Sequence, residues 1–234
     1  PDALSLRFLS GLSRAYQSGN AFSHVPALPS PAAMGLCFGP AGRSLIANSQ
    51  AVQRRIERWW GRESTVIHPP VDISSFATPD ISQLEKVLGH PEPGSYYLCL
   101  GQLVSYKRVD LAVQTCIATK RNLIVAGDGP EGKKLEKMAG PSVRFLRHVP
   151  NEAIPALYAG CRAFLFPGEE NFGITPLEAS AAGRPVIAYG KGGVLDSIIS
   201  DKTGLFFEQQ NIDSLIAAFD DFETAEDTVG IRTG

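Results

Sequence analysis

The sequence predicts an α/β protein in which a parallel β-sheet carries helices on both faces. Two observations support this fold class. Between residues 95 and 223, short apolar runs alternate with stretches whose apolar residues recur at helical spacing. The apolar runs at residues 96–100 and 163–166 are nearly continuous, which is typical of strands buried on both faces. Such alternation gives parallel sheets whose ligands bind at the carboxyl ends of the strands.

Six strands that alternate with helices form one doubly wound domain over residues 95–223. Its boundaries follow from where each apolar pattern starts and stops. We expect strands at residues 96–100, 122–126, 143–149, 163–166, 185–189 and 205–207, and helical segments at 108–119, 131–138, 152–159, 175–182, 194–199 and 212–222.

Residues 1–68 are too few for a second domain of this kind, so we interpret them as an incomplete N-terminal domain. Within them, residues 44–49 and 65–68 predict short strands, and Ser49 is the expected N-cap of the intervening helix. The spacing of Val52, Ile56, Trp59 and Trp60 places all four on one apolar face.

The remaining segments are assigned by composition. Residues 69–94 hold five prolines and one helical patch near 81–88, which indicates an interdomain connector. Residues 224–234 are expected to form a C-terminal tail.

Composition excludes several classes of protein. The formal net charge is -2, so a nucleic-acid binder that neutralises phosphates is not expected. No apolar run reaches the roughly 18 residues of a membrane span, and no charged-then-apolar signal opens the chain. The four cysteines lie far apart without a CxxC pair, which fits a reducing cytoplasm. A contact with the inner face of a membrane remains an alternative, because arginines line one face of the helix near residue 54.

The first candidate anion site follows the strand at residues 96–100. That strand ends at Gly101, and after Gln102 two adjacent cations, Lys107 and Arg108, precede the next helix. Cations at a helix start oppose the helix dipole by roughly 0.3–1 kcal/mol each, so their placement needs a compensating reason. Phosphate binding is one such reason, and a solvated basic pair is the structural alternative.

The second candidate follows the strand at residues 163–166. Glu170 stands at the end of that strand, and Glu178 lies eight positions later in the first turn of a helix. Between them, Gly173 lets a ligand approach the backbone, and the amides after it point out of the helix start as an anion site. Thr175 and Glu178 also have the spacing of a capping box, and spacing alone favours that structural role for Glu178.

A third pattern suggests a different class of enzyme. Gly127, Gly129 and Gly132 match GxGxxG between a strand and a helix, which is the fingerprint of an NAD-dependent oxidoreductase. The pattern follows the second strand of the domain, however, and Pro130 occupies the turn. We therefore interpret these glycines as turn residues. The histidines show no ligand spacing and no Asp-x-Asp occurs, so no metal is expected.

Over residues 44–223, these blocks together resemble the retaining GT-B glycosyltransferases of family 4. The most specific block is Glu-Asn-Phe-Gly-Ile-Thr-Pro-Leu-Glu-Ala at residues 170–179, and Tyr-Lys-Arg-Val-Asp-Leu-Ala and Ala-Gly-Asp-Gly-Pro support it. The resemblance implies a Rossmann-like donor domain that binds a nucleotide sugar as substrate and needs no cofactor. The resemblance implies that Glu178 holds the ribose, Glu170 holds the donor sugar, and Lys107 faces the diphosphate. It also implies that the backbone of Gly173, Ile174 and Thr175 holds the phosphate or sugar and that Val149 lies near the base. Gly101, Gln102 and Arg108 are the remaining expected donor-binding residues.

The expected function is therefore hexosyl transfer with retention, from GDP-mannose or alternatively a UDP-sugar, to a saccharide or lipid-linked acceptor. Two departures qualify it. The family usually has arginine where this chain has Gln102, and most of an acceptor-binding domain is absent from the sequence. A catalytically weakened nucleotide-sugar-binding protein is therefore the alternative, and the NAD-dependent oxidoreductase is a distant third.

Overall fold

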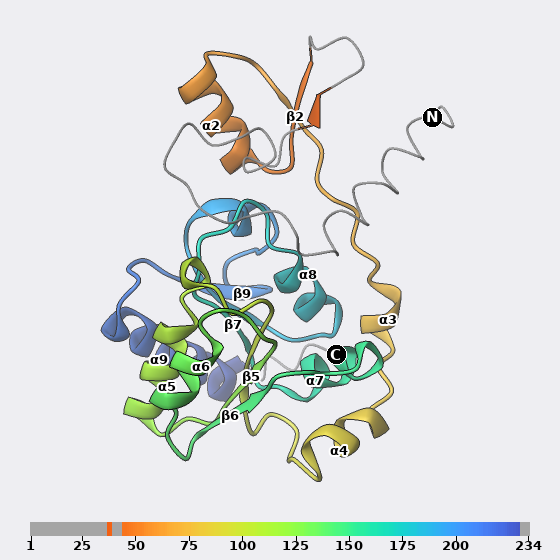
Figure 1. Ribbon diagram of the computed structural model, residues 1–234, viewed down its shortest axis with the longest axis vertical. Coiled ribbons are helices and arrows are strands. Elements are labelled where there is room, and N and C mark those ends of the chain that lie inside the picture. Colours follow the sequence, from red (N-terminus) through yellow and green to blue (C-terminus); the bar gives the residue numbers. More distant parts are fainter. Residues whose placement is uncertain (1–36, 39–43, 230–234) are drawn as a thin grey trace. The chain divides into compact units, whose positions relative to one another are not determined.

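The computed structural model describes residues 37–38 and 44–229 (Figure 1). The chain divides into two compact units, Pro1–Pro70 and Val71–Gly234. Among the described residues, no helix is both long enough and apolar enough to cross a membrane.

The described part of the smaller unit is a short sheet with one helix. Strand β2 (Leu45–Ala47) lies between β1 (Cys37–Phe38), which is antiparallel, and β3 (Thr65–Val66), which is parallel. Ser49 caps helix α2 (Gln50–Trp60) as expected, because its hydroxyl accepts from the amide of Val52 at 3.1 Å. The apolar face is narrower than expected, since Trp59 is 47% exposed. The small core consists of Leu45, Ala47, Val52 and Ile56, with Trp60 and Val66 packed against it.

The larger unit is built on six strands, and all of its neighbouring pairs are parallel. The predicted doubly wound fold class is thus confirmed. The order is β6-β5-β4-β7-β8-β9, so the chain first winds outward from β4 in one direction and then from β7 in the other. The strands are β4 (Tyr97–Leu100), β5 (Leu123–Ala126), β6 (Val143–Leu146), β7 (Phe164–Phe166), β8 (Val186–Tyr189) and β9 (Gly204–Phe207).

The strands and helices of this unit follow the expected order, but the bounds or type of three elements differ from the prediction. Strand β6 stops at Leu146 rather than at residue 149, the turn expected at 194–199 is a 3-10 helix at Gly192–Asp196, and the last helix continues to Val229 through much of the expected tail. The helices are α3 (Ser74–Ala77), α4 (Ser82–Leu88), α5 (Val109–Thr119), α6 (Gly132–Met138), α7 (Ile154–Gly160), α8 (Ile174–Ala181) and α9 (Ile212–Val229), with 3-10 helices η2 (Ser105–Lys107), η3 (Asn151–Ala153) and η4 (Gly192–Asp196).

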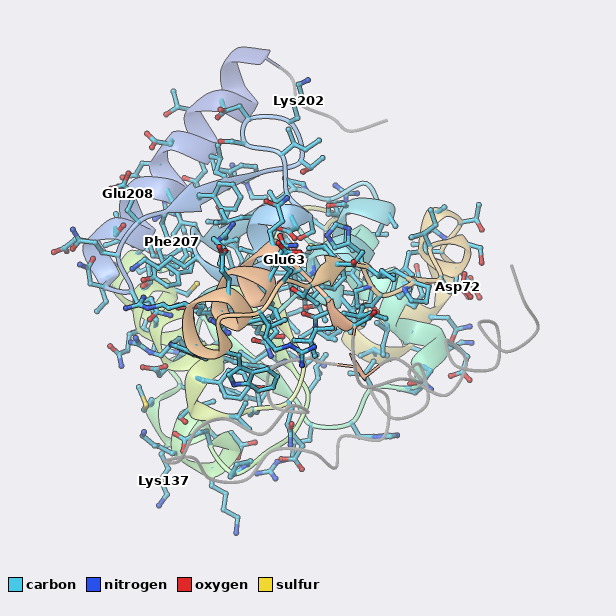
Figure 2. The ribbon with its side chains drawn as sticks, turned by 90° about the horizontal axis from the view of Figure 1, so that it is seen from above. Glu63, Asp72, Lys137, Lys202, Phe207 and Glu208 are labelled. Carbon is cyan, nitrogen blue, oxygen red and sulfur yellow. The ribbon has the colours of Figure 1, made fainter. Side chains whose placement is uncertain are left out.

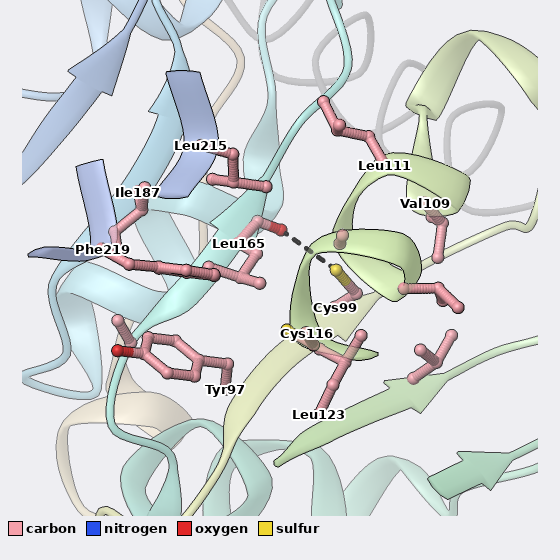
Figure 3. Close-up of a cluster of buried hydrophobic side chains, with 14 of the residues drawn as sticks. Tyr97, Cys99, Val109, Leu111, Cys116, Leu123, Leu165, Ile187, Leu215 and Phe219 are labelled. Carbon is pink, nitrogen blue, oxygen red and sulfur yellow. Dashed lines mark hydrogen bonds between the residues drawn. The ribbon is translucent and has the colours of Figure 1, made fainter. Parts of the chain in front are cut away.

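Two hydrophobic cores cover the two faces of the sheet. Successive side chains of a strand point to opposite faces, so Tyr97 and Cys99 enter one core and Leu98 the other. The first core lies under α5, α6 and α9, and Figure 3 shows Tyr97, Leu165 and Phe219 within it. The second core lies under α4, α7 and α8. The long apolar strand runs thus arise because both faces of the sheet are covered.

Residues 71–94, expected as a connector, pack onto the larger unit. Leu84 of α4 is buried in the second core, and the ring of Phe76 on α3 meets the ring of Tyr158 on α7 with centroids 5.8 Å apart. The guanidinium of Arg144 also donates to the carbonyls of Val87 and Leu88.

Charged side chains such as Lys137, Lys202 and Glu208 point outward from the fold (Figure 2).

Candidate active site

The candidate site lies where the winding of the sheet reverses. Strands β4 and β7 are neighbours but their crossovers run in opposite directions, and ligands of doubly wound sheets bind at the carboxyl ends of such strands. A pocket opens at this point. It is lined by Cys99, Leu100, Gly101, Gln102, Leu103, Lys107 and Val109 on the β4 side and by Phe164, Leu165, Phe166, Pro167, Gly168 and Glu170 on the β7 side.

An ion pair joins the two sides of the pocket. The ammonium of Lys107 lies 3.0 Å from Oε1 of Glu170, and the two side chains are only 20% and 13% exposed. This oxygen is buried, yet its contact with Lys107 lacks the angle of a hydrogen bond. The pair therefore holds a cation and a carboxylate together in the lining of the pocket while leaving hydrogen-bonding capacity on the carboxylate.

The loop that carries Glu170 is fixed by close backbone contacts. A side chain at Gly168 would come within 2.6 Å of the Cα of Lys107, so the two loops touch directly. On the other side, the amide of Gly193 in η4 donates to the carbonyl of Glu170 at 2.8 Å. A side chain at Gly192 would come within 2.5 Å of that same carbonyl. These contacts position Glu170 from both sides.

Two further members of the first expected site lie differently. Arg108 has a left-handed backbone with φ +51° and pairs with Asp110 at 3.1 Å, so its guanidinium is engaged on its own helix. It does not line the pocket. Gln102 does line the pocket and is exposed. Tyr106, which is not among the predicted site residues, is half-exposed beside Lys107, and burial raises the pKa of its hydroxyl.

The second expected site centres on the start of α8. The predicted capping box of Thr175 and Glu178 is wrong. The N-cap is Gly173 with φ +86°, the helix begins at Ile174, and the cap makes no side-chain hydrogen bond. A side chain at Gly173 would come within 3.0 Å of the Phe166 ring, so packing as well as φ requires glycine. Thr175 thus lies inside the first turn, where the backbone amides have no helical partner.

Glu178 does not cap the helix and instead contacts a buried tyrosine. Its Oε2 accepts a hydrogen bond of 2.9 Å from the hydroxyl of Tyr158 on α7. Burial raises the pKa of Glu178, and the hydrogen bond from Tyr158 opposes that rise. Tyr158 was not predicted from the sequence. A signal was present, because a tyrosine in a wholly apolar helix needs a partner for its hydroxyl.

The GxGxxG glycines serve the packing of two loops. Leu103 donates from its amide to Asp128 and accepts from the amide of Glu131, so the loop after β5 lies against the loop after β4. Side chains at Gly127 and Gly129 would overlap the carbonyl oxygens of Gly101 and Leu103. Both glycines are therefore explained without a dinucleotide.

Val149 lies beyond the end of β6. It is half-buried and packs against the second core, the core that also holds Tyr158. The structure thus gathers Gly101, Gln102, Lys107 and Glu170 around one pocket, while Arg108, Val149, Glu178 and the start of α8 lie outside its lining.

Comparison with known proteins identifies the class. The family model of the glycosyl transferases group 1 matches residues 80–229, and the chain belongs to this family. The fold agrees, because the Anabaena protein Alr3699/HepE, solved in complex with UDP, superposes with a TM-score of 0.69 at 24% identity over 80% of this chain and 55% of that one. A glycosyltransferase from Rickettsia africae superposes with a TM-score of 0.72 at 17% identity, over 94% of this chain and 64% of that one. The predicted GT-B likeness is thus confirmed for membership of the glycosyl transferases group 1 and for the fold.

Sequence relatives are more specific in their names. A GDP-mannose-dependent alpha-(1-6)-phosphatidylinositol monomannoside mannosyltransferase of Mycolicibacterium smegmatis is 31% identical over 53% of this chain and 37% of its own length. The lipopolysaccharide core biosynthesis mannosyltransferase LpsB of Rhizobium meliloti is 32% identical over 66% of this chain and 49% of its own length. The chain therefore spans less than half the length of these curated relatives.

Proposed function

We propose that this chain holds the donor in a hexosyl transfer from a nucleotide sugar, with GDP-mannose favoured and a UDP-sugar as the alternative. The observation that carries the proposal is the Lys107–Glu170 pair at the switch point of the sheet, 3.0 Å apart and mostly shielded from water. Family membership and the mannosyltransferase relatives support the same activity and donor. The acceptor we propose is a saccharide or a lipid-linked sugar.

Each proposed role matches the chemistry of the residue. The ammonium of Lys107 and the amides of Gly173, Ile174 and Thr175 would hold the diphosphate, since cations and helix starts bind anions. Carboxylates accept hydrogen bonds from hydroxyls, so Glu170 would hold the donor sugar and Glu178 the ribose. Val149 would lie near the base.

The reaction we propose proceeds with retention and without a metal. The bond between the anomeric carbon and the diphosphate breaks while the acceptor oxygen bonds to that carbon from the same face. The leaving phosphate oxygen takes the acceptor's proton, so no side chain has to serve as the base. Lys107 and the start of α8 would stabilise the negative charge that develops on the diphosphate.

The positive charge at this site is modest. Lys107 already contacts Glu170, Arg108 is engaged by Asp110, and position 102 carries glutamine. This supports, as the second candidate, a nucleotide-sugar-binding protein with weak turnover. Transfer of radiolabelled mannose from GDP-mannose to a lipid-extract acceptor separates the two, because only an enzyme accumulates labelled product over many turnovers. We further propose a cytoplasmic location, with a contact at the inner membrane face as the alternative.

Nucleotide binding should not need a metal ion. We expect GDP or UDP to bind the chain equally well with and without EDTA, because the anion sites are a lysine and helix amides rather than paired carboxylates. Isothermal titration calorimetry measures this directly. Loss of binding in EDTA would contradict it, and titration with NAD tests the oxidoreductase alternative in the same instrument.

Substitution of Glu178→Gln should weaken binding of GDP or UDP by about 10-fold, the scale of a hydrogen bond to a charged group. Folding should be retained, because the glutamine carbonyl can still accept from Tyr158. A folded variant with unchanged nucleotide affinity would return Glu178 to a purely structural role.

A further inference from the structure

Tyr158 is buried in the second core, and its hydroxyl reaches Glu178 on α8. Its side chain is fully buried, and its ring meets those of Phe76 and Phe164 at centroid distances of 5.8 and 5.3 Å. Its hydroxyl donates to Oε2 of Glu178 at 2.9 Å. The ring is thus fixed by packing on two sides, while the hydroxyl is directed at one carboxylate oxygen.

The surroundings of Glu178 make this donor important. Besides α7, helix α8 packs against α3, β7 and β8. None of these three carries Asp, Glu, Lys, Arg or His within its bounds, and Tyr189 of β8 lies in the other core. Beyond them, Asp72 is exposed before α3, Cys161 is a buried thiol at the end of α7, and the charge of Arg184 acts on Cys161 and Tyr96.

Within this setting, burial and the tyrosine act on Glu178 in opposite directions. Burial raises the pKa of the carboxyl, and the hydrogen bond from Tyr158 lowers it. The phenol itself stays protonated, because burial and the nearby carboxylate raise its pKa well above the usual range. Tyr158 is therefore a permanent donor that favours the ionised form of Glu178 near neutral pH.

We propose that Tyr158 is a positioning residue for donor binding: its hydroxyl holds one oxygen of Glu178 so that the carboxylate accepts hydrogen bonds from the ribose hydroxyls of the nucleotide. A carboxylate offers several lone-pair positions, so it can accept from Tyr158 and from a ribose at once. The proposal rests on the proposed function and adds to it a residue that touches Glu178 rather than the ligand.

The test compares two tyrosines that bury a hydroxyl in the same core. Tyr158→Phe removes the donor to Glu178 and keeps the ring contacts. Tyr96→Phe is the matched control, because the buried Tyr96 hydroxyl donates to the carbonyl of Leu157 at 2.8 Å and not to Glu178. For the full chain and each variant, calorimetry gives the affinity for GDP and UDP and for their 2′,3′-dideoxy forms, from below the ordinary carboxyl pKa to above neutrality.

We expect Tyr158→Phe to weaken binding of the ribose nucleotides by about 10-fold at neutral pH and to leave the dideoxy nucleotides unaffected. Without the hydrogen bond the pKa of Glu178 rises further, and the carboxylate is the binding form. As the pH is lowered, the affinity for ribose nucleotides should therefore begin to fall at a higher pH in this variant than in the unchanged chain. Tyr96→Phe should lower the thermal midpoint without changing either readout.

Several outcomes would overturn the proposal. Equal nucleotide affinities and pH profiles for the two variants would reduce Tyr158 to a packing residue, as would an equal loss for ribose and dideoxy nucleotides. If Tyr158→Phe does not fold, site-specific replacement of Tyr158 by a ring-fluorinated tyrosine, a stronger donor of the same shape, must shift the pH profile to lower pH. Absence of any GDP or UDP binding by the unchanged chain would overturn the proposed function together with this inference.

Discussion

Substitution of Gly127→Ala is expected to lower the free energy of unfolding by about 3 kcal/mol, because two costs add. The residue has φ +130°, a conformation that L-residues rarely adopt and that costs of order 1–3 kcal/mol. The new methyl group would also overlap the carbonyl oxygen of Gly101, which belongs to the backbone and cannot rotate away. Chemical denaturation of the purified variant and the unchanged chain measures the difference.

Gly132→Ala in the same motif is the matched control. Gly132 begins α6 without a positive φ, and its methyl group would lie 3.3 Å from Oδ1 of Asp128 and 3.5 Å from the Leu103 side chain. The Asp128 side chain is exposed, and although its Oδ1 accepts from the amide of Gly129 at 2.7 Å, a shift of a few tenths of an ångström relieves the contact, so we expect a change within about 1 kcal/mol. Equal losses for the two variants would show that the motif is not explained by contact between the two loops.

These two glycines illustrate what the sequence could predict. The pattern GxGxxG is visible in the sequence, but its meaning depends on which strand it follows and on what lies against it. The structure places it after β5 and against the backbone of Leu103, so the first glycines are required by a neighbouring loop. That loop is some 25 residues earlier in the chain, and periodicity carries no information on such contacts.

The strands of the larger unit were predictable for a physical reason. A parallel sheet covered on both faces needs apolar residues at consecutive positions, and such runs stand out in any window. Helix starts were harder to predict. Thr175 and Glu178 have the spacing of a capping box, yet the N-cap of α8 is Gly173, two residues before Thr175, and the helix begins at Ile174. That start depends on a positive φ and on the Phe166 ring, which short-range spacing cannot register.

For the candidate site too, the positions of the residues were predictable from the sequence, but their pairings were not. Lys107 and Glu170 each follow a strand, and the switch-point rule brings the ends of two neighbouring strands together. The sequence did not predict that the two side chains pair with each other, or that Arg108 pairs with Asp110. Pairings of this kind depend on side-chain direction, which is fixed only when the loops are in place.

At the amino-terminal ends of the central strands β4 and β7, an ion network holds the last helix in place. Glu223 of α9 accepts from the hydroxyl of Tyr97 at 2.7 Å and from the guanidinium of Arg121 at 2.9 and 2.8 Å. Arg162 adds a contact of 3.2 Å, and Arg121 also lies over the ring of Phe219. One carboxylate thus ties α9 to the starts of β4 and β7 and to the end of α5.

This network should make stability depend on pH in a defined window. The hydrogen bonds from Arg121, together with Tyr97, lower the pKa of Glu223 from 4.5 to about 2. A carboxyl whose pKa is depressed in the folded state stabilises the fold above its unfolded pKa and loses that contribution as pH falls through the folded one. The contribution of Glu223 is therefore present above pH 4.5 and disappears as the pH approaches about 2.

Substitution of Glu223→Ala should accordingly lower the free energy of unfolding by about 2–3 kcal/mol at neutral pH. A pKa shift of this size corresponds to somewhat more, which we reduce because Glu223 is about one-quarter exposed and water screens the charges. The control is Asp221→Ala, which removes an exposed carboxylate from the same helix and should change stability by less than about 0.5 kcal/mol. Denaturation curves at neutral pH and in the acid window measure both. The gap between Glu223→Ala and the unchanged chain must narrow as pH falls below 4.5. A gap that stays constant would mean that Glu223 stabilises α9 by packing rather than by charge.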